Sequence, residues 1–455
     1  MKLNEISASN HKQKTVFFIL SLLYILLLFV FSKKLDISQN YIFALILTPI
    51  IIFLILLNFE WNLLLFFALL HFIYFFFGNF VLSHYSLFIP FFFIILILKK
   101  GNLTINRTYL TVPSLFLLFS FILSFIFCQN KVASLNWHLI ISQLIIIYFF
   151  LISQITTRKK LYVFMGWLFA GYLISLTSGI MQIIISSGTD RVKGSLMNPN
   201  EFSGYLAFFI FISLFILKIS TRRSIIYGAF GLIIISLYLL LETYSRGGQL
   251  AFFIAFLIYI YIKIPPKYKF YAPIIIFFFT SVILLFLFRY GDLYVSRFTS
   301  FSDGNIDYST LDRVGLWISS WKLFLSSPIY GIGVNNFQDL YTQFHPTFYM
   351  FNFSHHLVAH NIFLNTLAEL GIIGFLALIF LHIAIFIKLI KLYNSVGSNF
   401  SREIVISMIA FFFFIVGHNM LDSYWTSYGH VVSHFMIVLF IAFIYFAEKF
   451  DKKME

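Results

Sequence analysis

Residues 371–390, GIIGFLALIFLHIAIFIKLI, form an almost unbroken apolar run that decides the fold class of this chain. The run has the length of roughly 20 residues that an α-helix needs to cross a bilayer. The rest of the chain has the same character, with 60% hydrophobic residues and 64 phenylalanines among 455 residues and a mean hydropathy of +0.93. Soluble domains do not carry this composition, so the sequence predicts an all-α, polytopic transmembrane helical bundle.

Further apolar runs lie on both sides of this stretch and give a bundle of about 12 to 14 predicted spans. Residues 84–98 are short and could form a re-entrant or tilted segment. No small-residue cleavage site follows the first run, so we expect no removable signal peptide. The other predicted spans cover residues 15–31, 41–57, 62–81, 109–128, 138–155, 161–186, 202–218, 224–242, 249–263, 271–288, 403–420 and 429–447.

Lysine and arginine orient these spans, because both residues accumulate in short cytoplasmic loops. Alternate loops carry basic clusters, and both basic termini fall on the same side when the number of spans is even; Lys33 and Lys34 are the clear exception. The formal net charge of +14 therefore has a topological explanation, and we expect no nucleic-acid partner. The clusters in the predicted cytoplasmic loops are Lys99, Lys100 and Arg107; Arg158, Lys159 and Lys160; Lys218, Arg222 and Arg223; Lys263, Lys267 and Lys269; and Lys388, Lys391 and Arg402.

The order of spans and loops divides the chain into four predicted parts. Residues 1–160 hold the N-terminal transmembrane helices, and residues 161–288 hold the central helices with arginine-bearing outer loops. Residues 289–359 form an extracytoplasmic loop that is too long for a simple connection and is expected to be partly folded. Residues 360–455 hold the C-terminal transmembrane helices. Cys128 is the only cysteine, which excludes an intrachain disulfide framework and a thiolate metal site.

Within the long loop, residues 309–324 have the pattern of an amphipathic helix with a serine or threonine cap. We expect this helix to end before Pro328. Trp317 and Trp321 are four residues apart, so they share one helix face and could seat the helix at the level of the lipid headgroups. Arg313 lies one turn earlier in the same row, where it would be close to lipid phosphates.

His360 and Asn361 stand where the long loop meets the C-terminal helices. A histidine that shares one water boundary with several arginines indicates chemistry at that boundary. The positive-inside rule disfavours arginine on the extracytoplasmic face, although for any single arginine a solvated or headgroup-bound charge is an equal explanation. The basic residues on this predicted face are Arg191, Lys193, Arg246, Arg289, Arg297, Arg313 and Lys322.

Four motifs follow one another on this face: Arg191 with Asn198-Pro199-Asn200, Ser245-Arg246-Gly247, Arg313 with Trp317 followed by Pro328 and Gly331-Ile332-Gly333, and His360-Asn361 followed by Gly371 and Gly374. In this order they resemble the O-antigen ligase and O-antigen polymerase superfamily, bacterial enzymes that transfer glycans from an undecaprenyl diphosphate carrier. The resemblance covers about residues 160–390, whereas the N-terminal spans match only in being hydrophobic.

The resemblance implies a glycosyltransferase of the bacterial cytoplasmic membrane, with its active site on the extracytoplasmic, periplasmic side and both termini in the cytoplasm. It makes His360 the general base or the group that orients the acceptor. Arg191 and Arg313 are then ligands of the donor diphosphate, and Arg246 is the expected third. The other expected substrate-binding residues are Asn361, Lys193, Trp317, His356 and Asn200.

Several of these residues have structural alternatives. His360 could be a helix-capping or interfacial histidine, and the neighbouring His355 and His356 could share or replace its role or be plain loop residues. Asn361 could cap the helix that follows rather than orient the imidazole. Gly371 and Gly374 are expected to permit close helix packing, and residues 198–200 are expected to form a turn that starts the next span.

The chemistry of these residue types suits glycan transfer from a diphosphate. The leaving diphosphate gains negative charge as the glycosidic C–O bond breaks, and guanidinium groups offer bidentate hydrogen bonds to phosphate oxygens. An imidazole can take the proton of the acceptor hydroxyl near neutral pH. Residues 303–307, DGNID, lack the full calcium-loop spacing, so we expect neither a metal nor another cofactor. His418 and Asp422 could pair on one helix face and belong to the acceptor site.

The acceptor separates the functional hypotheses. A polymerase joins one lipid-linked repeat unit to another, whereas a ligase moves the finished glycan to lipid A-core or to protein; the length of the chain and its divergent early spans favour the polymerase. A flippase would place ionisable residues at mid-membrane depth, where the predicted spans have almost none. A noncatalytic scaffold would tolerate loss of His360. Besides donor, acceptor and bilayer, the expected partners are a chain-length regulator and a flippase.

Overall fold

The computed structural model divides the chain into two compact units. The first comprises Met1–Val81 and Ile155–Ser178, and the second comprises Leu82–Gln154 and Gly179–Glu455. The structure describes residues 108–186, 190–196, 198–274, 277, 280–281, 308–346, 358–422 and 431–451. The predicted spans that lie wholly or largely outside the described residues are 15–31, 41–57, 62–81, 84–98 and 271–288.

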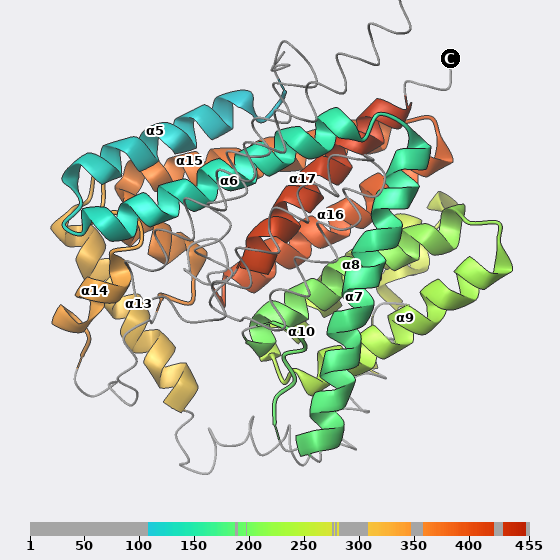
Figure 1. The fold of residues 1–455 in the computed structure, drawn as a ribbon, viewed down its shortest axis with the longest axis horizontal. Helices are drawn as coiled ribbons and strands as arrows, with labels where there is room; N and C mark the ends of the chain where they lie inside the picture. Colours follow the sequence, from blue (N-terminus) through green and yellow to red (C-terminus); the bar gives the residue numbers. More distant parts are fainter. Residues whose placement is uncertain are drawn as a thin grey trace, which may run out of the picture. The chain divides into compact units, whose positions relative to one another are not determined.

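The described residues of both units are mainly helical and contain no strand (Figure 1). In the first unit the described residues belong mainly to α7, Arg158–Ser186, whose last turns continue into the second unit. Six of the described helices, including α7, are long and apolar enough to cross a membrane. This confirms a polytopic helical bundle. The long helices of the second unit are α5 Thr111–Phe127, α6 Lys131–Gln154, α8 Pro199–Ile219, α9 Arg223–Glu242, α10 Arg246–Lys263, α15 Ile362–Ser395, α16 Asn399–Asn419 and α17 Val431–Asp451.

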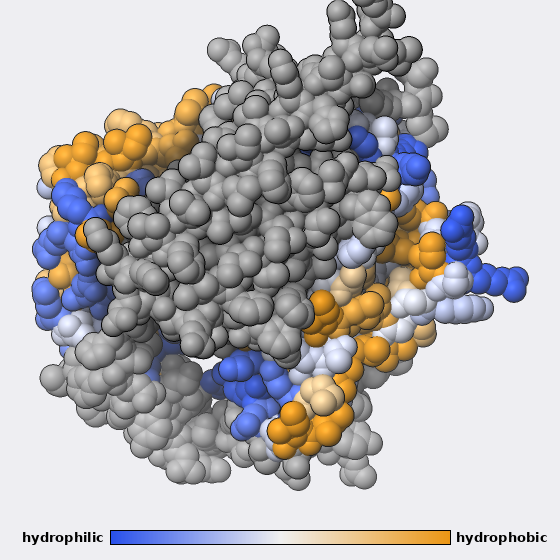
Figure 2. Space-filling model, viewed as in Figure 1, coloured by the Kyte–Doolittle hydropathy of each residue, from blue (hydrophilic) through white to orange (hydrophobic). Residues whose placement is uncertain are grey.

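Helices α8 and α16 form the centre of the second unit. Of the most apolar stretch of each helix, 72% is buried in α8 and 78% in α16, compared with 28% in α9. Aromatic rings join them: Phe208 of α8 meets Phe411 of α16 edge-on, with ring centroids 5.0 Å apart. Helices α5 and α9 instead carry large exposed apolar side chains, such as Ile122 and Phe230. Figure 2 shows apolar surface over α5. Exposed apolar faces of this kind suit contact with lipid, because the hydrocarbon core of a bilayer contains no water.

Polar caps start three helices at one end of this bundle. Asn198 accepts a hydrogen bond from Glu201 N at 2.8 Å, with Pro199 at the first helical position, so residues 198–200 form the predicted turn. Ser245 caps α10. Asn361 accepts from the backbone N–H groups of the second and third residues of α15, both at 3.0 Å. It therefore caps this helix, which is one of the two roles expected for it. Helix α15 therefore begins at Ile362 and not at residue 371 as predicted.

The predicted start of that span is instead a break inside α15. Gly371 has φ 65° and ψ −164°, which interrupts the helix. The segment after Pro328 lies along the break: Ile332 N donates to Ala368 O at 2.9 Å, and Ile372 N donates to Pro328 O at 2.8 Å. A side chain at Gly331 or Gly371 would collide with the facing backbone. Gly371 thus permits a close approach, as expected, but the partner is a loop rather than another helix.

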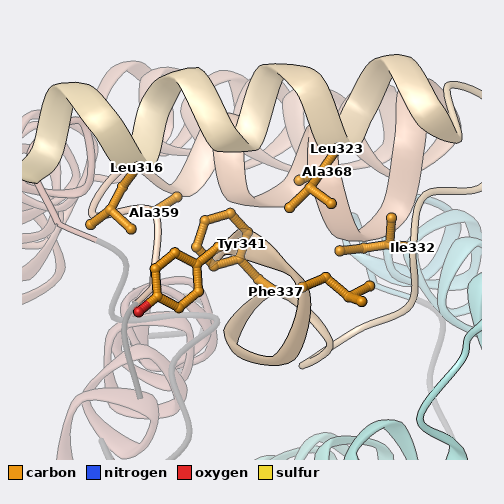
Figure 3. Close-up of a cluster of buried hydrophobic side chains, with 8 residues drawn as sticks. Leu316, Leu323, Ile332, Phe337, Tyr341, Ala359 and Ala368 are labelled. Carbon is orange, nitrogen blue, oxygen red and sulfur yellow. The ribbon is translucent and has the colours of Figure 1, made fainter. Parts of the chain in front are cut away.

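The long loop is partly folded, as predicted. Its amphipathic helix is α13, Tyr308–Ser326, which ends before Pro328. The predicted cap is wrong, because Ser309 and Thr310 lie inside the helix. The short helices α14, Phe337–Leu340, and η3, Tyr341–Gln343, follow. Together with α13 and α15 they enclose a buried cluster (Figure 3) that comprises Leu316, Leu323, Ile332, Phe337, Leu340, Tyr341, Ala359 and Ala368.

The opposite end of the bundle holds direct ion pairs, and we call it the lysine end. Lys263, the last residue of α10, pairs with Glu403 in the first turns of α16. Lys388 Nζ lies 2.7 Å from Glu448 of α17. The end that carries the three caps and His360 is called the His360 end. The two ends therefore hold different sets of polar residues.

Candidate functional site

A line of hydrogen bonds joins three of the predicted site residues at the His360 end. Arg191 Nη2 donates to Asn200 Oδ1 at 2.9 Å. Asn200 Nδ2 donates to Asp422 Oδ2 at 2.8 Å. The other oxygen of Asp422 lies 3.1 Å from His360 Nδ1. Segments that are far apart in the sequence, from before α8 to beyond α16, therefore meet at one site.

The imidazole of His360 is oriented from two directions. Asp422 Oδ1 accepts from Nδ1–H, which leaves Nε2 of the neutral ring as a proton acceptor. The backbone of His360 lies in the left-handed region, with φ 48°, a conformation that non-glycine residues adopt at a cost of about 1 to 2 kcal/mol. Asn361 Nδ2 donates to Met420 O at 3.0 Å, which ties the start of α15 to the end of α16. The side chain of His360 is 27% exposed, so the ring is held but remains accessible.

The loop that carries Arg191 is anchored by its backbone. Arg191 Nε donates to Thr243 O at 3.0 Å, just beyond the end of α9. Gln182 of α7 accepts from the backbone N–H of Lys193 at 3.0 Å and donates to Gly194 O at 2.6 Å. Arg191 and Lys193 are both exposed. The guanidinium is thus fixed in place at the surface of the site, whereas only the backbone of Lys193 is tied to this anchor.

Arg246 stands at the first position of α10, beside the same site. Its neighbour Gly247 packs against His418 and against Leu421, and Leu421 directly precedes Asp422 in the chain. Gly248 fits against Ser203 of α8 with no room for a side chain. These close approaches place the Ser245-Arg246-Gly247 motif against the end of α16 and the start of α8.

Arg313 reaches the same region from α13. The charges of Asp422 and Arg313 both act on His418, so the guanidinium is within electrostatic range of this end of α16. Trp317, one turn further along α13, is half-buried, and Trp321 is 49% exposed. Asp422 lies beyond the end of α16 and so, contrary to the prediction, is not on the same helix as His418, although its charge acts on His418. Its carboxylate also hydrogen-bonds to His360 and Asn200.

An apolar cavity of about 470 Å³ lies between α5, α6, α15 and α17. Along α15 its lining runs from Ile362, two residues after His360, to Leu378. The few polar lining groups include Thr366 and Glu369 of α15. The lining of the cavity along α15 therefore begins two residues from His360 in the chain.

The predictions for His355 and His356, for Arg289 and Arg297 on the outer face, and for residues 303–307 fall outside the described residues. Within the described residues, no group of three or more metal-ligating side chains comes together. Asp422 was predicted in the acceptor site, but its bond to His360 was not. The only sequence signal for it is an acidic residue just past the end of an apolar span.

Residues 231–379 match the family model of the O-antigen ligases. The match includes Arg246, Arg313 and His360, and it supports the O-antigen ligase and polymerase superfamily that the motifs suggested. Arg191, Asn200 and Asp422 lie outside it. No curated protein matches the chain. The apolar helices support an integral membrane protein, and the match supports a glycosyl-transferring activity.

Proposed function

We propose that this chain, as a member of the O-antigen ligase and polymerase superfamily, polymerises oligosaccharide repeat units carried on undecaprenyl diphosphate. The observation that carries the proposal is the line of hydrogen bonds from Arg191 through Asn200 and Asp422 to His360. It connects a group suited to phosphate with a group suited to proton transfer, and glycan transfer from a diphosphate requires both.

His360 is the general base of the proposed reaction. Its Nε2 takes the proton of the acceptor hydroxyl while the hydroxyl oxygen attacks the anomeric carbon of the donor sugar. The bond from that carbon to the diphosphate oxygen breaks, and undecaprenyl diphosphate leaves with the bonding electrons. Asp422 stabilises the imidazolium that forms and keeps Nδ1 protonated throughout. The imidazolium then returns its proton to water.

Arg191 and Arg313 bind the donor diphosphate in this proposal, and Arg246 adds a third guanidinium. The orientation of Arg191 is preset, because two of its donors are held by Thr243 O and Asn200 Oδ1. A preorganised donor of this kind typically contributes roughly 3 to 4 kcal/mol to the stabilisation of a developing negative charge. The leaving group is stabilised by protein charges, so we expect activity to persist in EDTA.

The apolar cavity supports a lipid-linked donor. Its lining along α15 starts beside His360 and extends down the helix. An isoprenoid chain is wholly apolar, and burial of each CH₂ group contributes about 0.8 kcal/mol. A donor with its diphosphate at the arginines and part of its chain in this cavity would present its first sugar to the imidazole.

The His360 end faces the extracytoplasmic side in this proposal, and the lysine end faces the cytoplasm of a bacterium. The basic residues of the lysine end support this orientation, because lysine and arginine accumulate on the cytoplasmic side. Lipid-linked repeat units would arrive through a flippase, and a chain-length regulator would limit the polymer.

A ligase is the second candidate function, since the family model that matches residues 231–379 is described as that of the O-antigen ligases. Deletion of the gene separates the two. A polymerase deletion leaves single repeat units on the final acceptor and no long chains, whereas a ligase deletion leaves full-length chains on undecaprenyl diphosphate. Normal surface glycan in the deletion strain would reject both.

A further inference from the structure

Glu369 is a buried acidic side chain in the apolar helix α15. Only 3% of its surface is exposed. It lies two turns from the start of the helix. An acidic group within a membrane helix is costly to insert, so acidic residues in spans generally have a specific task. The reaction proposed above uses the start of α15 at His360 but does not use this carboxylate.

Both oxygens of Glu369 accept hydrogen bonds. Oε1 accepts from Phe337 N at 3.1 Å, and the backbone N–H of Asn335 also donates to the carboxylate. Oε2 accepts from Asn365 Nδ2 at 3.1 Å. The side chain therefore links the loop that leads into α14 with a second polar residue of α15, one turn nearer to His360.

Asn365 carries the connection to the residue before the imidazole. Its Oδ1 accepts from Ala359 N at 3.3 Å. Ala359 is fully buried. The next residue, His360, has the left-handed backbone conformation, so the position of its ring depends on how firmly Ala359 is held. Glu369 is thus two hydrogen bonds away from the peptide that sets the direction of the imidazole.

The backbone of Glu369 adds a third attachment. Its carbonyl oxygen accepts from Gly333 N at 3.0 Å and from Ser124 Oγ of α5 at 2.8 Å. The carbonyl is available because Gly371 breaks α15 just after it. One residue therefore fastens together α5, the loop along the break and the approach to His360.

We propose that Glu369 is a positioning residue that acts through the Asn365 amide to hold Ala359 and, with it, the imidazole of His360. The inference rests on the proposed role of His360. Its chemical basis is the direction of each hydrogen bond. Because Glu369 accepts on Oε2, the Asn365 amide must turn its NH₂ toward Glu369, and only this orientation presents Oδ1 to the N–H of Ala359.

Two single substitutions disrupt this order of donors and acceptors. Glu369→Gln keeps an oxygen for Phe337 N but places an NH₂ group against the NH₂ of Asn365. Asn365→Asp still accepts from Ala359 N but places one carboxylate against another. We expect each variant to lower kcat about 10- to 100-fold, the scale of a displacement of about 1 Å at a reacting group, with little change in the KM for the donor.

The double variant Asn365→Asp with Glu369→Gln restores the bond between positions 365 and 369, with its direction reversed, and keeps the bonds to Ala359 N and Phe337 N. The amide introduced at position 369 donates its NH₂ to the carboxylate introduced at position 365. The second oxygen of that carboxylate accepts from Ala359 N, and the amide oxygen at position 369 accepts from Phe337 N. We therefore expect kcat to recover to within about threefold of the wild type, which is a favourable coupling between neighbouring residues. Glu403→Gln is the matched control: it also removes a buried carboxylate of a span, at the lysine end, and should leave kcat unchanged.

The test uses the purified full chain with lipid-linked glycan extracted from cells that lack the gene. A second readout needs no substrate: the rate at which diethyl pyrocarbonate modifies His360 in membranes, followed by mass spectrometry. We expect this rate to change in both single variants and to return in the double variant. Wild-type kcat and modification rate in Glu369→Gln, or a double variant no better than the single variants by both readouts, would overturn the inference.

His360→Ala separates this outcome from failure of the proposed function. If His360→Ala retains full glycan transfer, His360 is not the base, and the modification rate alone still decides whether Glu369 holds the ring. If the single variants accumulate poorly in membranes, recovery of both level and modification rate in the double variant supports the hydrogen-bond order, and failure of both to recover contradicts it.

Discussion

The two polar ends of the bundle differ in the contacts that their charged residues make. At the lysine end, opposite charges meet directly, as in Lys263 with Glu403 and Lys388 with Glu448. At the His360 end, Arg191 donates to a backbone carbonyl and to the neutral amide of Asn200. The ion pairs of the lysine end join neighbouring helices, whereas these two bonds fix the direction of a guanidinium at the surface of the molecule. On the function proposed above, we expect the lysine end to serve structure and the His360 end to serve chemistry.

His360→Ala tests this contrast most strongly. Loss of the proposed base should lower glycan transfer about 1000-fold, within the range of 10²- to 10⁴-fold expected for general base catalysis. The measurement is the rate of polymer formation by purified protein, with the amount of protein in the membrane as the control. A variant with more than a tenth of wild-type activity would remove His360 from the mechanism.

Arg191→Ala and Arg313→Ala come next. Each should lower turnover about 100-fold, because each removes a positive charge that stabilises the negative charge developing on the leaving diphosphate. Protein level and membrane insertion should stay normal, since both side chains lie at the surface or half-buried. Near-wild-type surface glycan in both variants would reject the diphosphate role.

Asp422→Asn should have a smaller effect. The amide can keep its bond to Asn200, but its NH₂ group then faces Nδ1 of His360 and favours the tautomer in which Nε2 carries the proton. Loss of a residue that orients a functional histidine typically costs about 10- to 100-fold. Kinetics should show the loss in kcat rather than in KM for the donor, and a change confined to KM would argue against this role.

Lys388→Ala, at the lysine end, should have the smallest effect. The ion pair with Glu448 is partly exposed, and such pairs contribute about 0 to 1 kcal/mol to stability. We expect activity within about twofold of the wild type, with stability lowered by at most about 1 kcal/mol in a thermal-unfolding assay. A large loss of activity would mean that the lysine end also takes part in the reaction, and the contrast between the two ends would fail.

Much of the architecture could be predicted from the chain, because a membrane helix is encoded locally. Length and apolar character specified the described spans, and the pattern of residues 309–324 specified α13. The start of α15 was missed because residues 362–370 carry Asn365 and Glu369, which interrupt the apolar run. These two residues lie four apart on one helix face, and that spacing was a signal available in the sequence.

The sequence by itself determined that the chain crosses a membrane many times, and it set His360, Arg191 and Arg313 apart as residues in need of an explanation. Only the tertiary structure decided that Asp422 holds His360, since 62 residues separate them. It also decided that α15 breaks at Gly371 to receive a loop. The physical reason is one of range: apolar length and caps act within a few residues of chain, whereas hydrogen-bond partners are selected by packing between distant segments.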